Sequence, residues 1–306
     1  MRKIISDYDG IMIETEYAKA YGWYLACLSL KGEDCDITSS LIEEIKTNPS
    51  SAEPRLRELA KAREGDLRIA KSCAGGTTLD FAKRIWQRFY VCDPEREPDD
   101  EEIRFINEEL IPRRSGIRDQ LIEWFAQPID GNLAFFKELY HAMRETYHDE
   151  HPIGLVNQSK SEGLKKQFDL KRNGISIWSA FPELPKIFGD FSDRGFPYAE
   201  CAGDGRIAYK NVPKECVKRV AYDILCGKLG IRPQETITFE DTRDGVIAAK
   251  NAGVLCIGVK SAESLQDLSQ ASLVIQGTLD RIRETIPIIV RSTPNKAKEE
   301  IAKYLS

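Results

Sequence analysis

The sequence contains no long hydrophobic run. No stretch approaches the roughly 18 consecutive apolar residues that a membrane-spanning helix needs. The amino terminus offers only Ile4 and Ile5 before polar residues, too little for the apolar segment of a signal peptide. These absences predict a cytoplasmic protein with no membrane partner. At 306 residues, the chain has the length of one large domain or two ordinary ones.

The eight cysteines include no C-x-x-C pair, the spacing of many zinc sites and redox motifs. Since no secretory segment is expected, reduced and partly buried thiols are favoured over disulfides. The cysteines are Cys27, Cys35, Cys73, Cys92, Cys201, Cys216, Cys226 and Cys256.

The net charge is small, and histidine is scarce. A formal net charge of −5 gives no electrostatic reason to expect binding to nucleic acid or to an anionic membrane. A small anionic substrate would need a metal ion or a few placed cations. The only three histidines are His141, His148 and His151. They are compatible with a metal cluster, but surface positions on one helix are favoured.

A short apolar strand near the amino terminus ends in two carboxylates. Asp7, Asp9 and Gly10 stand at the carboxyl end of the predicted strand, which is where ligands bind in parallel α/β sheets. Asp7 and Asp9 are two residues apart, so both point to the same side of an extended chain. Gly10 then allows a sharp turn. The pattern indicates either a metal-assisted phosphoryl-transfer site or an ordinary turn rich in Asp and Gly.

Residues 17–126 show no β-alternation and carry several helical patterns. Apolar residues recur there at spacings of three and four residues, which predicts amphipathic helices. The three clearest groups are Leu41, Ile42, Ile45; Leu79, Ala82, Ile85, Trp86, Phe89; and Ile103, Ile106, Leu110. This block is predicted to be an all-helical domain inserted after the first strand.

The rest of the chain alternates strands with helices, which predicts a parallel sheet with right-handed crossovers and therefore an α/β, Rossmann-like core. Helices are predicted over 133–147, 217–225 and 246–252. Further strands are predicted over 152–156, 236–239, 254–259 and 273–275.

Polar residues stand at the ends of three of these strands. Asp7 and Asp9 follow the first, Asn157, Gln158 and Ser159 the second, and Glu240 and Asp241 the third, while Lys210 begins a helix between the last two. Carboxylates from separate strand ends, together with a substrate phosphate, suit Mg²⁺. Mg²⁺ and the lysine would neutralise the phosphate, so that an anionic carboxylate could attack phosphorus and a second carboxylate could transfer protons.

These residues resemble the motifs of the haloacid dehalogenase (HAD) superfamily of hydrolases, in the phosphatase and β-phosphoglucomutase-like branch with a helical cap. Asp7-Tyr8-Asp9-Gly10 is similar to the D-x-D-G motif, and Lys210 stands in a K-x-x-P setting. The segment from Glu240 to Gly253 is similar to E-D-T/S-x-x-G-x-x-A-A-x-x-A-G.

The resemblance implies roles for these residues. It makes Asp7 the nucleophile that forms an aspartyl-phosphate, and Asp9 the general acid and base. It implies Asp241 as a direct Mg²⁺ ligand supported by Glu240, with Asp7 and the backbone carbonyl of Asp9. Lys210 would bind the phosphate.

Further roles concern the phosphate. Asn157, Gln158 and Ser159 are the other candidates for phosphate binding. Asn157 departs from the family pattern, which has Thr or Ser there. An amide donates a similar hydrogen bond, and Ser159 is the nearest hydroxyl.

The resemblance also implies a domain organisation. The predicted core comprises residues 1–16 and 127–292, and the helical cap residues 17–126. The residues themselves predict that the C-terminal tail, 293–306, is an exposed helix. Residues 178–209 form a longer connection than the family has, and a hairpin, flap or oligomer contact is predicted there. No pattern indicates the oligomeric state.

The sequence is compatible with three hypotheses for the function. The leading hypothesis is a Mg²⁺-dependent phosphatase that hydrolyses a small phosphorylated metabolite, with the cap closing over the substrate. A phosphomutase is the closest alternative, but no histidine precedes His141, and Lys19 stands near the place of the mutases' cap-hinge histidine. A non-catalytic descendant that binds a phosphorylated ligand or a protein is the third. Aromatic residues early in the cap, Tyr17 to Tyr24, are either substrate contacts or, more readily, helix core.

Overall fold

The computed structural model divides the chain into two compact units. The core unit comprises Met1–Ile13 and Pro128–Ser306, and the helical unit comprises Glu14–Gln127. The described residues are 3–31, 35–74, 78–148, 152–156, 171–172, 175–176, 188–189, 219, 222–223, 225–227, 229–261, 264 and 266–306.

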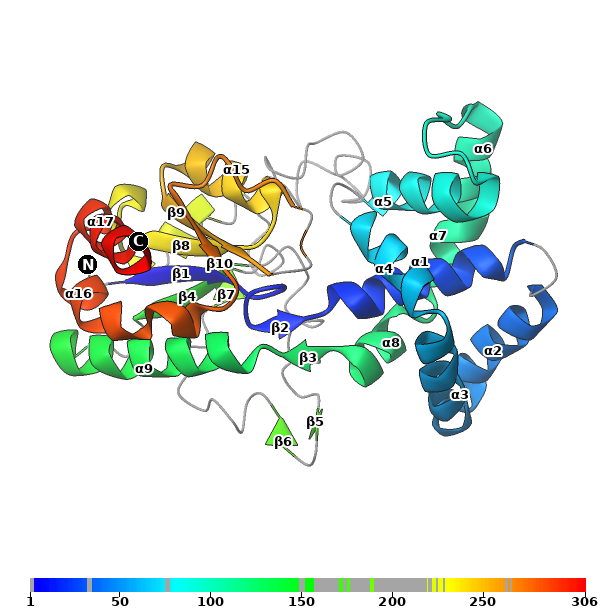
Figure 1. Cartoon of the computed structure of the whole chain (residues 1–306), viewed down its shortest axis with the longest axis horizontal. Helices are drawn as coiled ribbons and strands as arrows, with labels where there is room; N and C mark the ends of the chain where they lie inside the picture. The colour runs from blue at the N-terminus through cyan, green and yellow to red at the C-terminus, as the bar shows by residue number, and fades with distance from the viewer. Residues whose placement is uncertain are drawn as a thin grey trace. The chain divides into compact units, whose positions relative to one another are not determined.

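The core unit is built on a parallel sheet of six described strands in the order β10-β9-β8-β1-β4-β7 (Figure 1). The strands are β1 (Ile4–Asp7), β4 (Ile153–Val156), β7 (Phe188–Gly189), β8 (Ile237–Glu240), β9 (Leu255–Lys260) and β10 (Leu273–Gln276). Every pair is parallel. All residues of β1, β4 and β8 are buried, as expected for strands covered on both faces. The predicted α/β core with a parallel sheet is confirmed.

Helices cover both faces of this sheet. On one face, α9 (Asp130–Tyr147) places Phe135 and Phe136 against Phe239 of β8, with ring centroids 5.7 and 5.5 Å away. On the other face, α15 (Arg243–Ala252) and the helical residues within 222–229 form one apolar cluster with Ile5 of β1. Figure 1 shows α9 and α15 on opposite sides of the strands.

The C-terminal part of the core unit is packed rather than exposed. After η4 (Leu279–Thr285) and α16 (Ile286–Arg291), the chain ends in α17 (Pro294–Leu305). A terminal helix was predicted correctly, but its exposure was not, because Ala297 and Ile301 are fully buried. Their four-residue spacing gives α17 an apolar stripe that packs on the core unit.

The chain passes from one unit to the other twice, after Ile13 and after Gln127. The short strands β2 (Ile13–Glu14) and β3 (Gln127–Pro128) pair with each other. Within the core unit, the backbone N–H of Ile129 donates to the carbonyl of Met12 at 3.0 Å. The buried side chain of Asn132 donates to the carbonyl of Ile11 at 2.7 Å and accepts from the N–H of Leu279 at 2.6 Å.

The helical unit is organised around α1 (Glu16–Leu28), which contacts helices on several sides. Tyr21, Trp23 and Tyr24 are at most 2% exposed, so these aromatic residues belong to its core. The surrounding elements are α2 (Cys35–Thr47), α3 (Pro49–Ala62), α4 (Glu64–Ser72), α5 (Thr78–Ile85), π-helical η1 (Trp86–Val91), α6 (Asp100–Phe105), π-helical η2 (Ile106–Leu110), α7 (Ile111–Ser115) and α8 (Arg118–Phe125). The predicted all-helical character is confirmed for the described residues.

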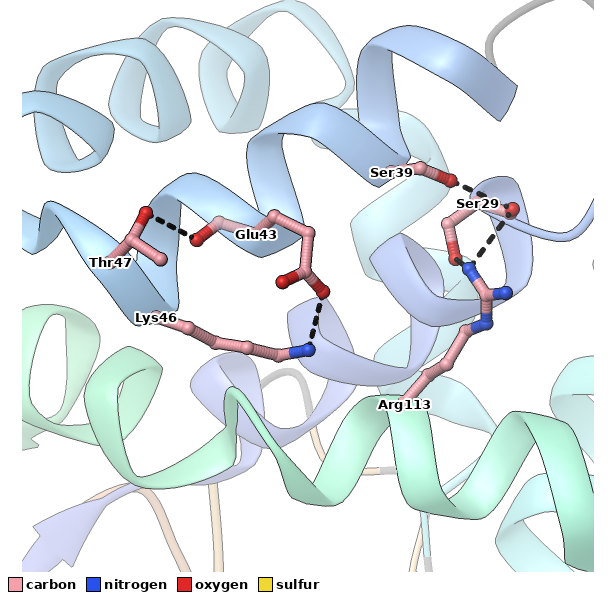
Figure 2. Close-up of polar contacts among 6 residues, drawn as sticks. All are labelled: Ser29, Ser39, Glu43, Lys46, Thr47 and Arg113. Carbon is pink, nitrogen blue, oxygen red and sulfur yellow. Dashed lines mark hydrogen bonds and ion pairs between the residues drawn. The ribbon is translucent and has the colours of Figure 1, made fainter.

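Ser29, which follows α1, joins three helices of this unit (Figure 2). Its carbonyl oxygen accepts a hydrogen bond from the hydroxyl of Ser39 on α2, at 3.2 Å, and from Arg113 on α7, at 3.5 Å. Farther along α2, Lys46 pairs with Glu43 at 2.6 Å. Polar contacts thus fix the ends of helices whose apolar sides form the core.

Cysteine and histidine behave as predicted where the structure describes them. Among the described residues, five cysteines are in no disulfide, and of these Cys92 alone is exposed. Burial raises the pKa of Cys27 to about 12 and that of Cys226 to about 11, so both remain protonated at neutral pH. His141 and His148 are exposed on α9 and at its end. None of the described helices combines the length and the apolar character that crossing a lipid bilayer requires.

Alkaline pH is expected to destabilise the protein in part through Tyr21. Its hydroxyl donates to the carbonyl of Leu56 at 2.8 Å, and burial raises its pKa well above 10.0. The contribution of the protonated Tyr21 hydroxyl to the free energy of unfolding is fully present below the pKa of an unfolded tyrosine, about 10. It is lost as pH rises above that value, because the unfolded chain releases the proton first. Thermal unfolding of Tyr21→Phe should show a lower midpoint at neutral pH and a shallower decline above about pH 10.

The matched control is Tyr304→Phe, because the Tyr304 side chain is 51% exposed. It should reproduce the pH dependence of the wild type. A decline of the same steepness in Tyr21→Phe and the wild type would contradict the prediction.

Candidate active site at the carboxyl ends of the strands

Asp7 is placed by the pairing of the central strands. Ile5 is in register with Thr238 of β8, and Asp7 is in register with Val156 of β4. Because side chains alternate along a strand, Asp7 projects from the same face of the sheet as Ile5. Its side chain is 4% exposed, and its Oδ1 accepts a hydrogen bond from the N–H of Tyr8 at 2.9 Å. The carboxylate is therefore both buried and oriented.

The loop after β1 turns sharply and approaches Asp241, the residue that follows β8. The N–H of Met12 donates to the carbonyl of Tyr8 and the N–H of Gly10 to that of Ile13, both at 2.8 Å. Gly10 has a φ of +82°, and a Cβ on it would lie 1.8 Å from Oδ2 of Asp241. A side chain at position 10 would thus occupy the space of the Asp241 carboxylate. Asp9, within this loop, is partly buried.

The end of β8 brings two more carboxylates. Glu240 is fully buried and Asp241 partly buried. Thr242 then caps α15, since its hydroxyl accepts a hydrogen bond from the N–H of Gly245 at 3.2 Å. A Cβ on Gly245 would lie 1.9 Å from Oε2 of Glu240, so the first turn of the helix lies directly against that carboxylate.

Carboxylate oxygens of Asp7, Glu240 and Asp241 lie within 4.8 Å of one another. Three carboxylates at this spacing repel one another, and a hard divalent cation with oxygen ligands relieves that repulsion. The donor set therefore fits a divalent metal ion. It contains three of the four residues predicted to bind metal. The side chain of Asp9 is outside this group, and its predicted contribution was the backbone carbonyl.

The predicted phosphate-binding residues lie outside the described residues. These are Asn157, Gln158, Ser159 and Lys210. In the sequence, Asn157 directly follows Val156, the residue of β4 in register with Asp7. The predicted hairpin within 178–209 also lies outside the described residues, apart from β7.

Tyr222 is a residue that the sequence reasoning missed. Its hydroxyl donates to Oε1 of Glu240 and lies 3.1 Å from the hydroxyl of Thr238. Burial, with the Glu240 carboxylate beside it, raises the pKa of Tyr222 well above 10.0, so the phenol stays protonated. Its only sequence signal is the apolar stripe that it shares with Leu225, Cys226 and Leu229, where it is the one residue with a hydroxyl.

The helical unit has a cavity of its own, of about 310 Å³. Tyr17, Arg57, Ala60, Lys61, Glu64 and Phe125 line it. The guanidinium of Arg57 lies 5.1 Å from the centre of the Phe125 ring and pairs with Glu53 at 2.6 Å.

One solved structure decides the fold. The β-phosphoglucomutase of the archaeon Pyrococcus sp. strain ST 04 superimposes with a TM-score of 0.51 over 90% of this chain and 92% of that one, at 16% identity. The chain has the HAD fold. A HAD hydrolase of family IA, variant 3, from Entamoeba histolytica aligns over 95% of this chain and all of that one, with a TM-score of 0.47 at 16% identity. The fold that the resemblance implies is confirmed by the first of these two structures.

Similarity in sequence is more local. No protein-family profile matches the chain. A validoxylamine A 7'-phosphate phosphatase from Streptomyces hygroscopicus subsp. limoneus is 33% identical over 55 residues, which are 18% of this chain and 26% of that protein. The aligned segment thus covers about a quarter of the length of that phosphatase.

Glycine substitutions should separate close packing from backbone strain at this candidate site. Gly10→Ala combines a positive φ with a clash against Asp241, whereas Gly230→Ala has a φ of +65° and nothing within 4 Å. Both should lose stability, by about 1–2 kcal/mol from the backbone alone. Gly10→Ala alone should also lose divalent-cation binding, measured by calorimetry. Equal binding by the two variants would contradict the proposed closeness of the loop and Asp241.

Gly245→Ala tests whether close packing also matters in the first turn of α15. Its Cβ would clash with Glu240, whereas Gly65→Ala in α4 meets nothing within 4 Å. Gly65→Ala should gain about 0.5–1 kcal/mol of stability, because alanine is the better helix residue. Gly245→Ala should lose both stability and cation affinity. A gain of stability in both variants would contradict the packing of α15 on Glu240.

Proposed function

We propose that the protein is a Mg²⁺-dependent phosphatase that hydrolyses a small phosphorylated metabolite through an aspartyl-phosphate. The observation that carries the proposal is the convergence of Asp7, Glu240 and Asp241 within 4.8 Å at the carboxyl ends of two paired strands. The HAD fold and the local similarity to a phosphatase support it.

Mg²⁺ would be held by the carboxylates of Asp7 and Asp241, with Glu240 and the backbone carbonyl of Asp9 in support. When bound, the ion supplies positive charge that offsets the repulsion between an anionic nucleophile and a phosphate ester. Oxygen ligands of this type and number match the preference of Mg²⁺.

Asp7 is proposed as the nucleophile. Its carboxylate oxygen attacks phosphorus, a P–O bond forms, and the bond from phosphorus to the leaving alcohol oxygen breaks. The hydrogen bond from Tyr8 N–H restricts the carboxylate to one orientation before attack. The product of this step is an acyl phosphate on Asp7, which divides the transfer into two easier steps.

Asp9 is proposed to move the protons. In the first step its carboxylic acid protonates the leaving alcohol oxygen. In the second step its carboxylate removes a proton from the water that attacks the aspartyl-phosphate, which releases inorganic phosphate and frees Asp7. Asn157, Gln158, Ser159 and Lys210 are proposed to bind the phosphate oxygens, with the amide of Asn157 in the place of a hydroxyl.

The substrate class follows from charge and from the relatives. A chain with a net charge of −5 needs a metal ion or a few placed cations to attract an anionic ester. The similar phosphatase acts on validoxylamine A 7'-phosphate, which supports a small phosphorylated metabolite as substrate. One structural neighbour is a β-phosphoglucomutase, which supports a mutase as the second candidate.

Asp7→Asn should abolish phosphate release. An amide cannot form the acyl phosphate, so turnover of a generic ester such as p-nitrophenyl phosphate should fall below detection. Asp9→Asn should reduce turnover by about 10²–10⁴-fold, the usual contribution of general acid and base catalysis. Asp119→Asn, which removes an exposed carboxylate of the helical unit, should match the wild type. Equal release by Asp7→Asn and wild type would refute the nucleophile assignment.

Product analysis distinguishes a phosphatase from a mutase and from a non-catalytic protein. With a screen of phosphorylated metabolites, a phosphatase releases inorganic phosphate, whereas a mutase returns an isomeric phosphate ester. A non-catalytic protein does neither, and it should also fail to bind beryllium fluoride as a phosphate mimic at Asp7 in the presence of Mg²⁺.

Removal of metal should abolish turnover and lower thermal stability together. At a Mg²⁺ concentration about 100 times the dissociation constant, binding to the folded state adds about 2.7 kcal/mol. Unfolding should therefore occur at a higher temperature with Mg²⁺ than with a chelator. The double variant Asp7→Asn/Asp241→Asn should show no such difference. An unfolding temperature of the wild type that is independent of Mg²⁺ would count against the metal site.

A further inference from the structure

Tyr222 lies directly behind the carboxylates of the candidate site. It is fully buried in the apolar cluster formed by α15, by residues of the sheet and by its own helical neighbours Leu225 and Leu229. Those two leucines lie against Gly154 of β4, where a Cβ would approach their methyl groups to about 3 Å. The helical segment is thus pressed closely on the sheet, and the Tyr222 ring is held in place by packing.

The Tyr222 hydroxyl has two partners on β8. It donates to Oε1 of Glu240 and lies 3.1 Å from Oγ1 of Thr238. Thr238 and Glu240 are two residues apart on one strand, so both project toward the same helix layer. A fully buried carboxylate is costly without hydrogen bonds, and this phenol supplies one to Glu240.

Glu240 is confined from a second direction. Its Oε2 lies against Gly245 in the first turn of α15, where even a methyl group would come within 1.9 Å. Its carboxylate is therefore held between the hydroxyl of Tyr222 and the backbone of Gly245. Asp7 and Asp241 complete the group within 4.8 Å. Rotation of the Glu240 side chain would require breaking its bond to Tyr222.

We propose that Tyr222 is a positioning residue of the metal site, whose hydroxyl fixes the Glu240 carboxylate in the orientation that supports the cation. The inference rests on the proposed function, since it assumes that the three carboxylates bind Mg²⁺. Partners behind metal-supporting groups orient them and typically contribute 10–100-fold to metal affinity. Tyr222 contacts neither substrate nor phosphorus in this account and acts only through Glu240.

Tyr222→Phe tests the inference, since it removes only the hydroxyl. Calorimetric titration with MgCl₂, without substrate, should show affinity weaker by about 10–100-fold. With a phosphate ester, the Mg²⁺ concentration for half-maximal rate should rise similarly, while kcat at saturating Mg²⁺ should stay near that of the wild type. Tyr147→Phe is the matched control, because its hydroxyl donates to the carbonyl of Val290 at 2.6 Å, in a contact between α9 and α16. It should bind Mg²⁺ like the wild type.

The outcomes separate this inference from the proposed function. If the wild type binds Mg²⁺ and Tyr222→Phe binds it equally well, the positioning role is overturned and the phosphatase proposal stands. If the wild type does not bind Mg²⁺, both are overturned. Tyr222→Met provides a second variant without the hydroxyl that still fills the apolar cluster. If neither variant folds, Tyr222 is a core residue and the positioning role is likewise overturned.

Discussion

The mutual repulsion of three carboxylates is the constraint on which the site depends. At 4.8 Å, two unit negative charges repel by roughly 3–4 kcal/mol at an effective dielectric constant of 20. Asp7 and Glu240 are also buried, which adds a desolvation cost. The pairing of β1 with β8 nevertheless holds them together. Hydrogen bonds from Tyr8 N–H and the Tyr222 hydroxyl offset part of this cost, and a divalent cation would offset the rest.

Close backbone approach is the second requirement, and glycine meets it at two positions. Gly10 lets the loop after β1 turn with a positive φ and leaves room for the Asp241 carboxylate. Gly245 lets the first turn of α15 reach Glu240 while Thr242 caps the helix. Two elements distant in sequence are thus brought against neighbouring carboxylates, Asp241 and Glu240. The motif glycines are explained by space rather than by flexibility alone.

The helical unit uses its aromatic residues mainly for its own stability. Tyr21, Trp23 and Tyr24 fill the space around α1, and Tyr21 also donates to a backbone carbonyl of α3. These side chains are therefore not available to recognise a substrate. Within this unit, the groups that remain accessible around its cavity include Tyr17, Arg57 and Lys61. Under the proposed function, any contribution of this unit to substrate recognition would thus come from these residues rather than from the aromatic cluster.

The sequence by itself determined the parallel sheet, the all-helical insertion and the identity of the acidic motifs, because continuous apolar runs, three- and four-residue spacings and Asp-x-Asp-Gly are local patterns. Apolar periodicity placed the helix that follows the insertion at 133–147. Its true start, Asp130, lies in a polar first turn that periodicity does not detect.

Only the tertiary structure decided which groups meet. Strand register set Asp7 beside the end of β8, and helix packing set the Tyr222 hydroxyl on Glu240. It also buried one side of α17, which local polarity had predicted to be exposed. Such contacts depend on residues as far apart as 7 and 240, and no local pattern encodes a distance across the sheet.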